Sequence, residues 1–202
     1  MKILILSKPR SRSTCLAEAL AKKYDLEYIP IAHDFYQQIP HGPLVKSLRE
    51  GNVYDVAPAG DYPELANIIK NRNSELSTRD FVTKLEIQYL CQLPWSCHLI
   101  DLELFDFTMY DKIYITGRAN AVDSVSSFFL ADKLNNWTNN ISVTKKHKIA
   151  SNLSKLDLST WPIWLEVLSA ILMDHVKSYL TKNQIEYTYL DYDQIPEFAN
   201  LA

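Results

Sequence analysis

The first thirty residues place the strongest limit on how this chain can fold. Residues 2–6 form a short, continuous apolar run, typical of a strand that is buried on both faces of a parallel sheet. Residues 14–23 carry Leu16 and Leu20 at helical spacing among alanines, and residues 26–31 follow as a second strand. A strand, a helix and a strand in this order predict a βαβ unit, and therefore a parallel sheet with a right-handed crossover.

The rest of the chain continues this alternation. Its length of 202 residues agrees with one domain, residues 1–202, because domains usually contain about 100–200 residues. We therefore expect a single α/β domain with a mostly parallel central sheet flanked by helices. In the helix expected at residues 121–132, the spacing places Val122, Val125 and Phe129 on one face. The further strands are predicted at residues 81–85, 112–116 and 185–190, and the further helices at residues 64–70, 121–132 and 161–180.

Residues 33–63 interrupt the alternation. They hold three of the four glycines of the chain and four of its nine prolines. A segment of this length without regular structure inside a compact domain is usually functional or mobile. We therefore expect a substrate loop or lid in this segment.

Composition and charge argue against several classes of protein. The chain has 21 Lys and Arg residues against 24 Asp and Glu residues, a net charge of -3, so no overall attraction to nucleic acid or to an anionic membrane is expected. The three cysteines form no CxxC pair and the histidines are scattered, which argues against a metal site and favours a reducing compartment. The apolar run near the N-terminus is too short for a signal peptide or a membrane span, so we expect a cytoplasmic protein without membrane insertion.

A turn rich in cations and hydroxyl groups lies between the first strand and the first helix. Residues 7–14 read Ser-Lys-Pro-Arg-Ser-Arg-Ser-Thr. At a helix N-terminus, the unpaired N–H groups and the helix dipole already favour an anion, and Arg10 and Arg12 add positive charge. Ser and Thr are also the preferred helix caps, but a cap needs only one hydroxyl group. The pattern therefore favours an anion-binding turn over a plain cap.

A second turn of this kind follows the strand at residues 112–116. Gly117 and Arg118 come directly after that strand, and Ser126 lies eight residues beyond Arg118 in the next helix. In open α/β sheets, ligands bind beyond the carboxyl ends of the strands. Taken alone, the segment could be an exposed Arg and a polar helix face. Beside the first turn, it is better interpreted as a second phosphate contact.

Together, the two turns resemble the signatures of the sulfotransferases that use 3′-phosphoadenosine 5′-phosphosulfate (PAPS). The first turn, Pro9-Arg10-Ser11-Arg12-Ser13-Thr14, resembles the Pro-Lys/Arg-Ser-Gly-Ser/Thr-Thr turn that joins a strand to a helix in this family. Arg118 and Ser126 match the spacing of the second signature, a strand that ends in Arg with a Ser eight residues later. The tail at residues 189–194 is similar to the family's late strand, which often ends in a Tyr-Glu-Asp-Leu-like turn.

This resemblance implies a P-loop NTPase-like fold, PAPS as the sulfuryl donor, adenosine 3′,5′-bisphosphate (PAP) as the product, and no metal ion. By this correspondence, Arg10 contacts the sulfate-bearing phosphate and the leaving oxygen, while Arg118 and Ser126 hold the 3′-phosphate. Hydroxyl groups and nearby amides of the first turn would cradle the 5′-phosphate. The cofactor-binding residues of that turn would be Lys8, Pro9, Arg10, Ser11, Arg12, Ser13 and Thr14.

The chain departs from the family pattern at three places. Arg12 stands where Gly is more common, which makes the turn bulkier. Cys15 stands where cytosolic members have an adenine-stacking Trp, and the late Arg-Lys-Gly loop of those members has no counterpart. The resemblance therefore points to the broad family and not to its cytosolic steroid and phenol branch.

Sulfuryl transfer also needs a base on the acceptor. Lys84 and Glu86 match the spacing of a Lys-x-His pair that cytosolic members carry between the two phosphate signatures, with Glu in the place of His. Alternation along a strand puts both side chains on the same side. The alternative for this pair is an ordinary surface ion pair. His33, in the turn after the second strand, is the rival base.

The expected reaction moves a sulfuryl group in line to a hydroxyl or amine of a small molecule, lipid or glycan, in a bacterial or virus-encoded enzyme. Two other functions compete with it. One is a P-loop-like nucleotide kinase or phosphotransferase, and the other is a non-catalytic module that binds phosphorylated ligands or nucleotides. With four glycines, the chain has neither a GxGxxG loop nor a Walker loop, and its negative charge does not favour binding to nucleic acid.

Overall fold

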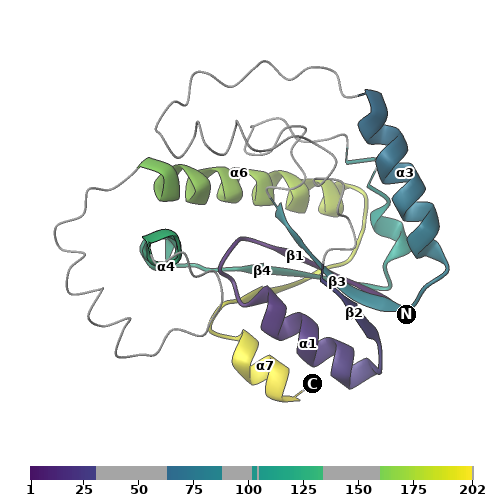
Figure 1. Cartoon of the computed structure of the whole chain (residues 1–202), viewed down its shortest axis with the longest axis horizontal. Helices are drawn as coiled ribbons and strands as arrows, with labels where there is room; N and C mark the ends of the chain where they lie inside the picture. The colour runs from purple at the N-terminus through teal and green to yellow at the C-terminus, as the bar shows by residue number, and fades with distance from the viewer. Residues whose placement is uncertain (31–62, 88–101, 104, 134–159, 202) are drawn as a thin grey trace.

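The computed structural model describes residues 1–30, 63–87, 102–103, 105–133 and 160–201 (Figure 1). Within these residues, five strands form one sheet in the order β2-β3-β1-β4-β5, and every neighbouring pair is parallel. The predicted α/β class with a parallel sheet is confirmed. The strands are β1 (Lys2–Ser7), β2 (Glu27–Ile29), β3 (Phe81–Glu86), β4 (Lys112–Gly117) and β5 (Thr188–Asp191).

Helices cover both faces of this sheet. Each expected helix is present, although α3 runs well past residue 70, where the sequence pattern weakens. Two elements were not predicted, the last helix and a short 3₁₀ turn, because neither contains enough residues to show a period. The helices are α1 (Ser13–Tyr24), α3 (Pro63–Ser77), α4 (Ala121–Lys133), α6 (Thr160–Lys182) and α7 (Ile195–Leu201), and the 3₁₀ turn is η3 (Phe107–Met109).

The apolar run of β1 is explained by its central position in the sheet. Leu4 and Leu6 point to one face and pack in a buried cluster with residues of α3 and α6. Ile3 and Ile5 point to the other face and pack with residues of α1 and α7. Figure 1 shows the same layers, with α6 and α3 on one side of the sheet and α1 and α7 on the other. A strand that is buried on both faces carries apolar side chains on both of them, which explains the unbroken apolar run at residues 3–6.

The strand order creates a topological switch point between β1 and β4. The connection through α1 leads from β1 past β3 to β2, whereas the connection from β4 leads in the opposite direction to β5. Right-handed crossovers that run in opposite directions place their helices on opposite faces of the sheet, as observed for α1 and α6. In such sheets, ligands bind in the crevice beyond the carboxyl ends of the strands at this point. Both turns singled out in the sequence begin there.

The buried face of α4 differs from the predicted one. The side chain of Val122 is 72% exposed, and at residues 121–129, where the side chains of this helix are described, the buried ones are Ser124 and Phe128. The spacing of apolar residues did not identify the buried face of α4, because a serine, Ser124, lies on that face. Ser124 donates a hydrogen bond of 2.6 Å to Glu166 of α6, which satisfies its hydroxyl group inside the protein.

Two expectations concern residues outside the described ranges. One is the substrate loop or lid at residues 33–63, of which only Pro63, the first residue of α3, is described. The other is His33, the rival base, which lies in the same segment. Among the residues that the structure does describe, no helix combines the length and apolar character needed to cross a bilayer.

Candidate anion-binding site

The turn from β1 to α1 is closed against the end of β4. The amide of Lys8 donates a 3.0 Å hydrogen bond to the carbonyl of Thr116. Ser11 donates from its hydroxyl to the carbonyl of Lys8 at 2.6 Å, and its oxygen lies 2.7 Å from the hydroxyl of Thr116. Ser11 is almost fully buried, so its hydroxyl shapes the turn from within. The two turns that were expected to form one phosphate site therefore lie side by side.

Two residues of this turn have a left-handed backbone. Arg10 has φ 61° and Arg12 has φ 60°, a conformation that favours glycine and costs other residues roughly 1–2 kcal/mol. Arg12 is the residue before α1 and makes no capping hydrogen bond with its side chain. The plain-cap interpretation of the Ser and Thr residues is therefore wrong, because Ser13 and Thr14 lie inside the helix. Strained residues of this kind occur preferentially at functional sites.

This backbone at Arg12 gives a prediction that separates strain from charge. Arg12→Gly and Arg12→Ala both remove the guanidinium group, but only glycine adopts a positive φ without a steric penalty. We expect Arg12→Gly to be more stable than Arg12→Ala by about 1 kcal/mol in urea unfolding. Both variants should show the same reduced affinity for a phosphate-bearing ligand in calorimetry. Equal stabilities of the two variants would show that the turn is not strained at Arg12.

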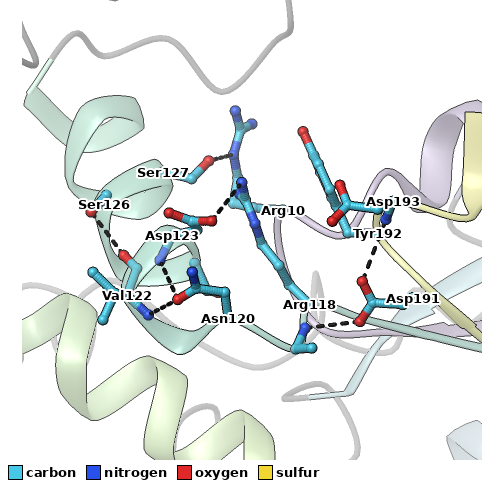
Figure 2. A network of polar contacts seen from close by, with 12 residues as sticks. Arg10, Arg118, Asn120, Val122, Asp123, Ser126, Ser127, Asp191, Tyr192 and Asp193 are labelled. Carbon is cyan, nitrogen blue, oxygen red and sulfur yellow. Dashed lines mark hydrogen bonds and ion pairs between the residues drawn. The ribbon is translucent and has the colours of Figure 1, made fainter.

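The second turn, between β4 and α4, brings Arg118 beside Arg10 (Figure 2). Asn120 caps α4, since its side-chain oxygen accepts hydrogen bonds from the amides of Val122 and Asp123 at 3.0 and 3.3 Å. A terminal nitrogen of Arg118 lies 4.0 Å from the carboxylate of Asp123, and Asp123 is more than half exposed. This weak ion pair leaves the turn with a surplus of positive charge.

The serine that joins the two turns is Ser127, not Ser126. The Nε atom of Arg10 donates to the hydroxyl of Ser127 at 3.2 Å, as Figure 2 shows. Ser126, expected to hold a phosphate, donates its hydroxyl to the carbonyl of Val122 one turn back in its own helix at 2.8 Å. Successive residues of a helix are rotated by about 100°, so a shift of one residue changes which side chain meets the turn.

A third turn, after β5, completes the group. The amide of Tyr192 donates to the carbonyl of Gly117 at 2.9 Å, and Asp191 accepts from the amide of Ala119 at 2.8 Å. Gly117 fits here because a Cβ atom at this residue would lie 2.6 Å from the hydroxyl of Tyr189. Residues 189–194 resemble the late strand of the family, but no site residue was predicted in this tail.

The ring of Tyr192 lies against two arginines. The guanidinium carbon of Arg12 is 3.9 Å from the centre of the ring, and that of Arg118 is 4.2 Å from it. Arg12 also donates to the carbonyl of Tyr192 at 3.4 Å. Cation–π contacts of this kind are favourable by about 0.5–2 kcal/mol. The guanidinium groups of arginines from two separate turns therefore contact the same aromatic ring.

Lys8 does not belong to this group of cations. Its ammonium group forms a buried ion pair with Glu166 of α6, and both side chains are no more than one-tenth exposed. The second oxygen of Glu166 accepts the hydrogen bond from Ser124. In this structure the ammonium group of Lys8 is used by the buried pair, and the contact of Lys8 with a cofactor stays a prediction. Pro9, next in the turn, is buried as well.

Glu86 and Lys84 lie on the face of the sheet that carries α1, as alternation predicts. In the register of the sheet, Glu86 is the partner of Ser7 at the carboxyl end of β1. The hydroxyl of Ser7 is buried and has no hydrogen-bond partner among the described residues. Lys84 donates to the hydroxyl of Thr14 at 3.0 Å, so this lysine contacts the predicted turn directly.

The electrostatics of Arg10 connect these groups. Burial lowers the pKa of Arg10, Tyr192 and Glu86 raise it by their negative charge when ionised, and the neighbouring Arg118 lowers it further. An arginine remains protonated at neutral pH despite such effects. Arg10, Arg118, Glu86 and Tyr192 are therefore close enough to influence one another, and three guanidinium groups meet at the switch point.

The chain matches no protein-family model, and no curated protein is significantly similar to it. The arrangement of side chains is thus the basis for assigning a function. Within the described part of the chain, no three His, Cys, Asp or Glu side chains are grouped so that they could hold a metal ion.

Proposed function

We propose that this protein is a sulfotransferase that moves a sulfuryl group from PAPS to a hydroxyl or amine of a small molecule, lipid or glycan. One observation carries the proposal: Arg10, Arg12 and Arg118 come from turns that are more than 100 residues apart and meet at the switch point of the sheet. PAPS carries anionic groups at two places, on the 5′ and the 3′ oxygens. A site with several guanidinium groups on two adjoining turns suits such a ligand, because arginine binds phosphate through paired donors.

In this proposal each side chain has one task. Arg10, at the helix N-terminus, stabilises the charge that builds on the leaving phosphate as the bond between sulfur and its bridging oxygen breaks. The acceptor oxygen or nitrogen attacks sulfur from the opposite side and gives its proton to Glu86. Arg118 holds the 3′-phosphate and keeps the donor in line. Arg10 cannot supply a proton, because its pKa remains too high for that role.

The competing nucleotide-kinase function lacks an available lysine in the first turn. Kinase-type phosphate loops place a lysine on the terminal phosphates of the nucleotide. Lys8 is the only lysine of residues 7–14, and it is paired with Glu166 away from the three arginines. The geometry therefore supports sulfuryl transfer better than phosphoryl transfer from ATP.

Binding of three ligands tests the proposal directly. We expect PAP to raise the melting temperature of the protein far more than ATP or a short RNA does, since only PAP carries two separate phosphate monoesters, one on the 5′ and one on the 3′ oxygen. Arg118→Ala should weaken PAP binding roughly ten- to a hundredfold in calorimetry, because a charge-assisted contact contributes about 1.5–3 kcal/mol. Its effect on adenosine 5′-phosphate should be small.

Arg79→Ala is the matched control. Arg79 pairs with Glu27 on the surface and precedes β3. It therefore lies at the amino ends of the strands, whereas the site lies at their carboxyl ends. Arg79→Ala should leave PAP affinity unchanged.

A larger shift of the melting temperature with ATP than with PAP would favour the kinase, and a response to RNA alone would favour a binding module. Either result would overturn the proposed function.

A further inference from the structure

The arrangement around Tyr192 differs from a plain Arg and Ser pair on the second phosphate. Ser126, the residue at the expected spacing from Arg118, uses its hydroxyl inside α4. The group that accompanies Arg118 is instead the guanidinium of Arg12, because both lie over the same ring within 4.2 Å of its centre. Two like charges held beside one ring repel each other, and Asp123, 4.0 Å from Arg118, opposes only one of them. An anionic group of a ligand would lower this repulsion further.

Hydrogen bonds among three turns hold the backbone around Tyr192 in place. The amide of Tyr192 is bound to Gly117, the residue directly before Arg118. Asp191 accepts from the amide of Ala119, directly after Arg118, and Arg12 donates to the carbonyl of Tyr192. The tyrosine is therefore attached to both turns that carry the arginines. These hydrogen bonds fix the backbone from which the ring of Tyr192 projects.

We infer that Tyr192 is a positioning residue that aligns Arg12 and Arg118 on one dianionic group of the ligand. This inference rests on the proposed function, in which that group is the 3′-phosphate of the donor. A planar ring can orient two planar guanidinium groups by their faces, so that N–H groups at their edges remain able to bind a ligand. One edge of Arg12 is used by the carbonyl of Tyr192, and one nitrogen of Arg118 lies near Asp123. The consequence is a preference for adenosine 3′,5′-bisphosphate over adenosine 5′-phosphate that depends on an aromatic side chain at residue 192. Arg12 then serves the second phosphate and not only the first.

Two substitutions at Tyr192 distinguish alignment from simple packing. Tyr192→Phe keeps the ring and should retain the preference of the unaltered protein for the bisphosphate within about twofold. Tyr192→Leu keeps comparable bulk without an aromatic face, and should reduce that preference by about tenfold, equal to about 1.4 kcal/mol. Calorimetry with both nucleotides gives the preference as a ratio of dissociation constants. A merely structural role of the ring would lower both affinities together and leave this ratio unchanged.

Arg12→Lys provides a second route if Tyr192→Leu folds poorly. Lysine keeps the positive charge but lacks the flat group that stacks on a ring and offers paired donors. We expect the affinity for the bisphosphate to fall several-fold more than the affinity for adenosine 5′-phosphate, so that the preference between them falls. In the Tyr192→Leu protein, the same Arg12→Lys change should have a smaller effect, because coupled residues are not additive.

The outcomes separate this inference from the proposed function. If the unaltered protein prefers the bisphosphate and both Tyr192→Leu and Arg12→Lys keep that preference, the role of Tyr192 is wrong and the proposed function stands. If the unaltered protein shows no preference for the bisphosphate, both are overturned. A preference that falls in these two variants and survives in Tyr192→Phe supports the inference.

Discussion

Replacing Glu86 with Gln is expected to cut turnover by about 10²–10⁴, the usual range for loss of a general base. Glutamine has the same shape but cannot accept the proton of the acceptor. Donor affinity should stay nearly constant or rise slightly, because Glu86 lies close enough to Arg10 for its negative charge to raise the pKa of that arginine. Single-turnover rates with bound PAPS, together with PAP affinity from calorimetry, measure the two effects separately.

A solvent isotope effect distinguishes a base from a carboxylate that only balances the charge of Arg10. Either group must be ionised and loses its effect at acidic pH, but only a base takes a proton in the transition state. A base therefore makes the single-turnover rate slower in D₂O, and this effect should disappear in Glu86→Gln. Glu75→Gln is the matched control, since Glu75 is exposed on α3 and paired with Arg72. Arg10→Ala should impair both turnover and donor affinity. Full activity of Glu86→Gln with an inactive His33→Ala would move the base to His33.

The sequence was sufficient for the features that local patterns encode. The apolar run of β1, the helical spacing of α1 and the strong strand β4 placed two turns at the carboxyl ends of neighbouring strands. The parallel sheet then followed from the order of the elements. That Arg10 and Arg118 lie close together could therefore be predicted, although no contact between them is visible in the sequence.

Features that depend on orientation or on distant pairing could not be predicted in this way. Ser126 and Ser127 are adjacent, and only the rotation of α4 against the first turn decides that Ser127 meets Arg10. Glu166 lies in a strongly apolar stretch, and its partner Lys8 is 158 residues away. Tyr192 follows a weak, short strand, and its importance depends on two arginines brought to it by other turns.

Glu166→Ala is expected to destabilise the protein by about 3–5 kcal/mol, because it leaves the ammonium group of Lys8 buried without a partner. The hydroxyl of Ser124 would lose its acceptor as well. Urea unfolding followed by circular dichroism measures the change. Asp174→Ala on the exposed side of the same helix is the control and should change the free energy of unfolding by less than about 0.5 kcal/mol.

Removing both charges tests what the buried pair is for. Lys8→Met combined with Glu166→Leu should recover most of the lost stability, since apolar residues of similar volume often replace a buried ion pair without loss. The single and double variants then separate stability from function. If the double variant is stable and binds PAP as the unaltered protein does, the pair only maintains the fold. If it is stable but binds PAP several-fold more weakly, the pair positions the first turn against α4. Glu166 can do this because it contacts both Lys8 in that turn and Ser124 in α4. A stable Glu166→Ala protein would contradict the expectation that the ammonium group of Lys8 stays buried without a partner in that variant.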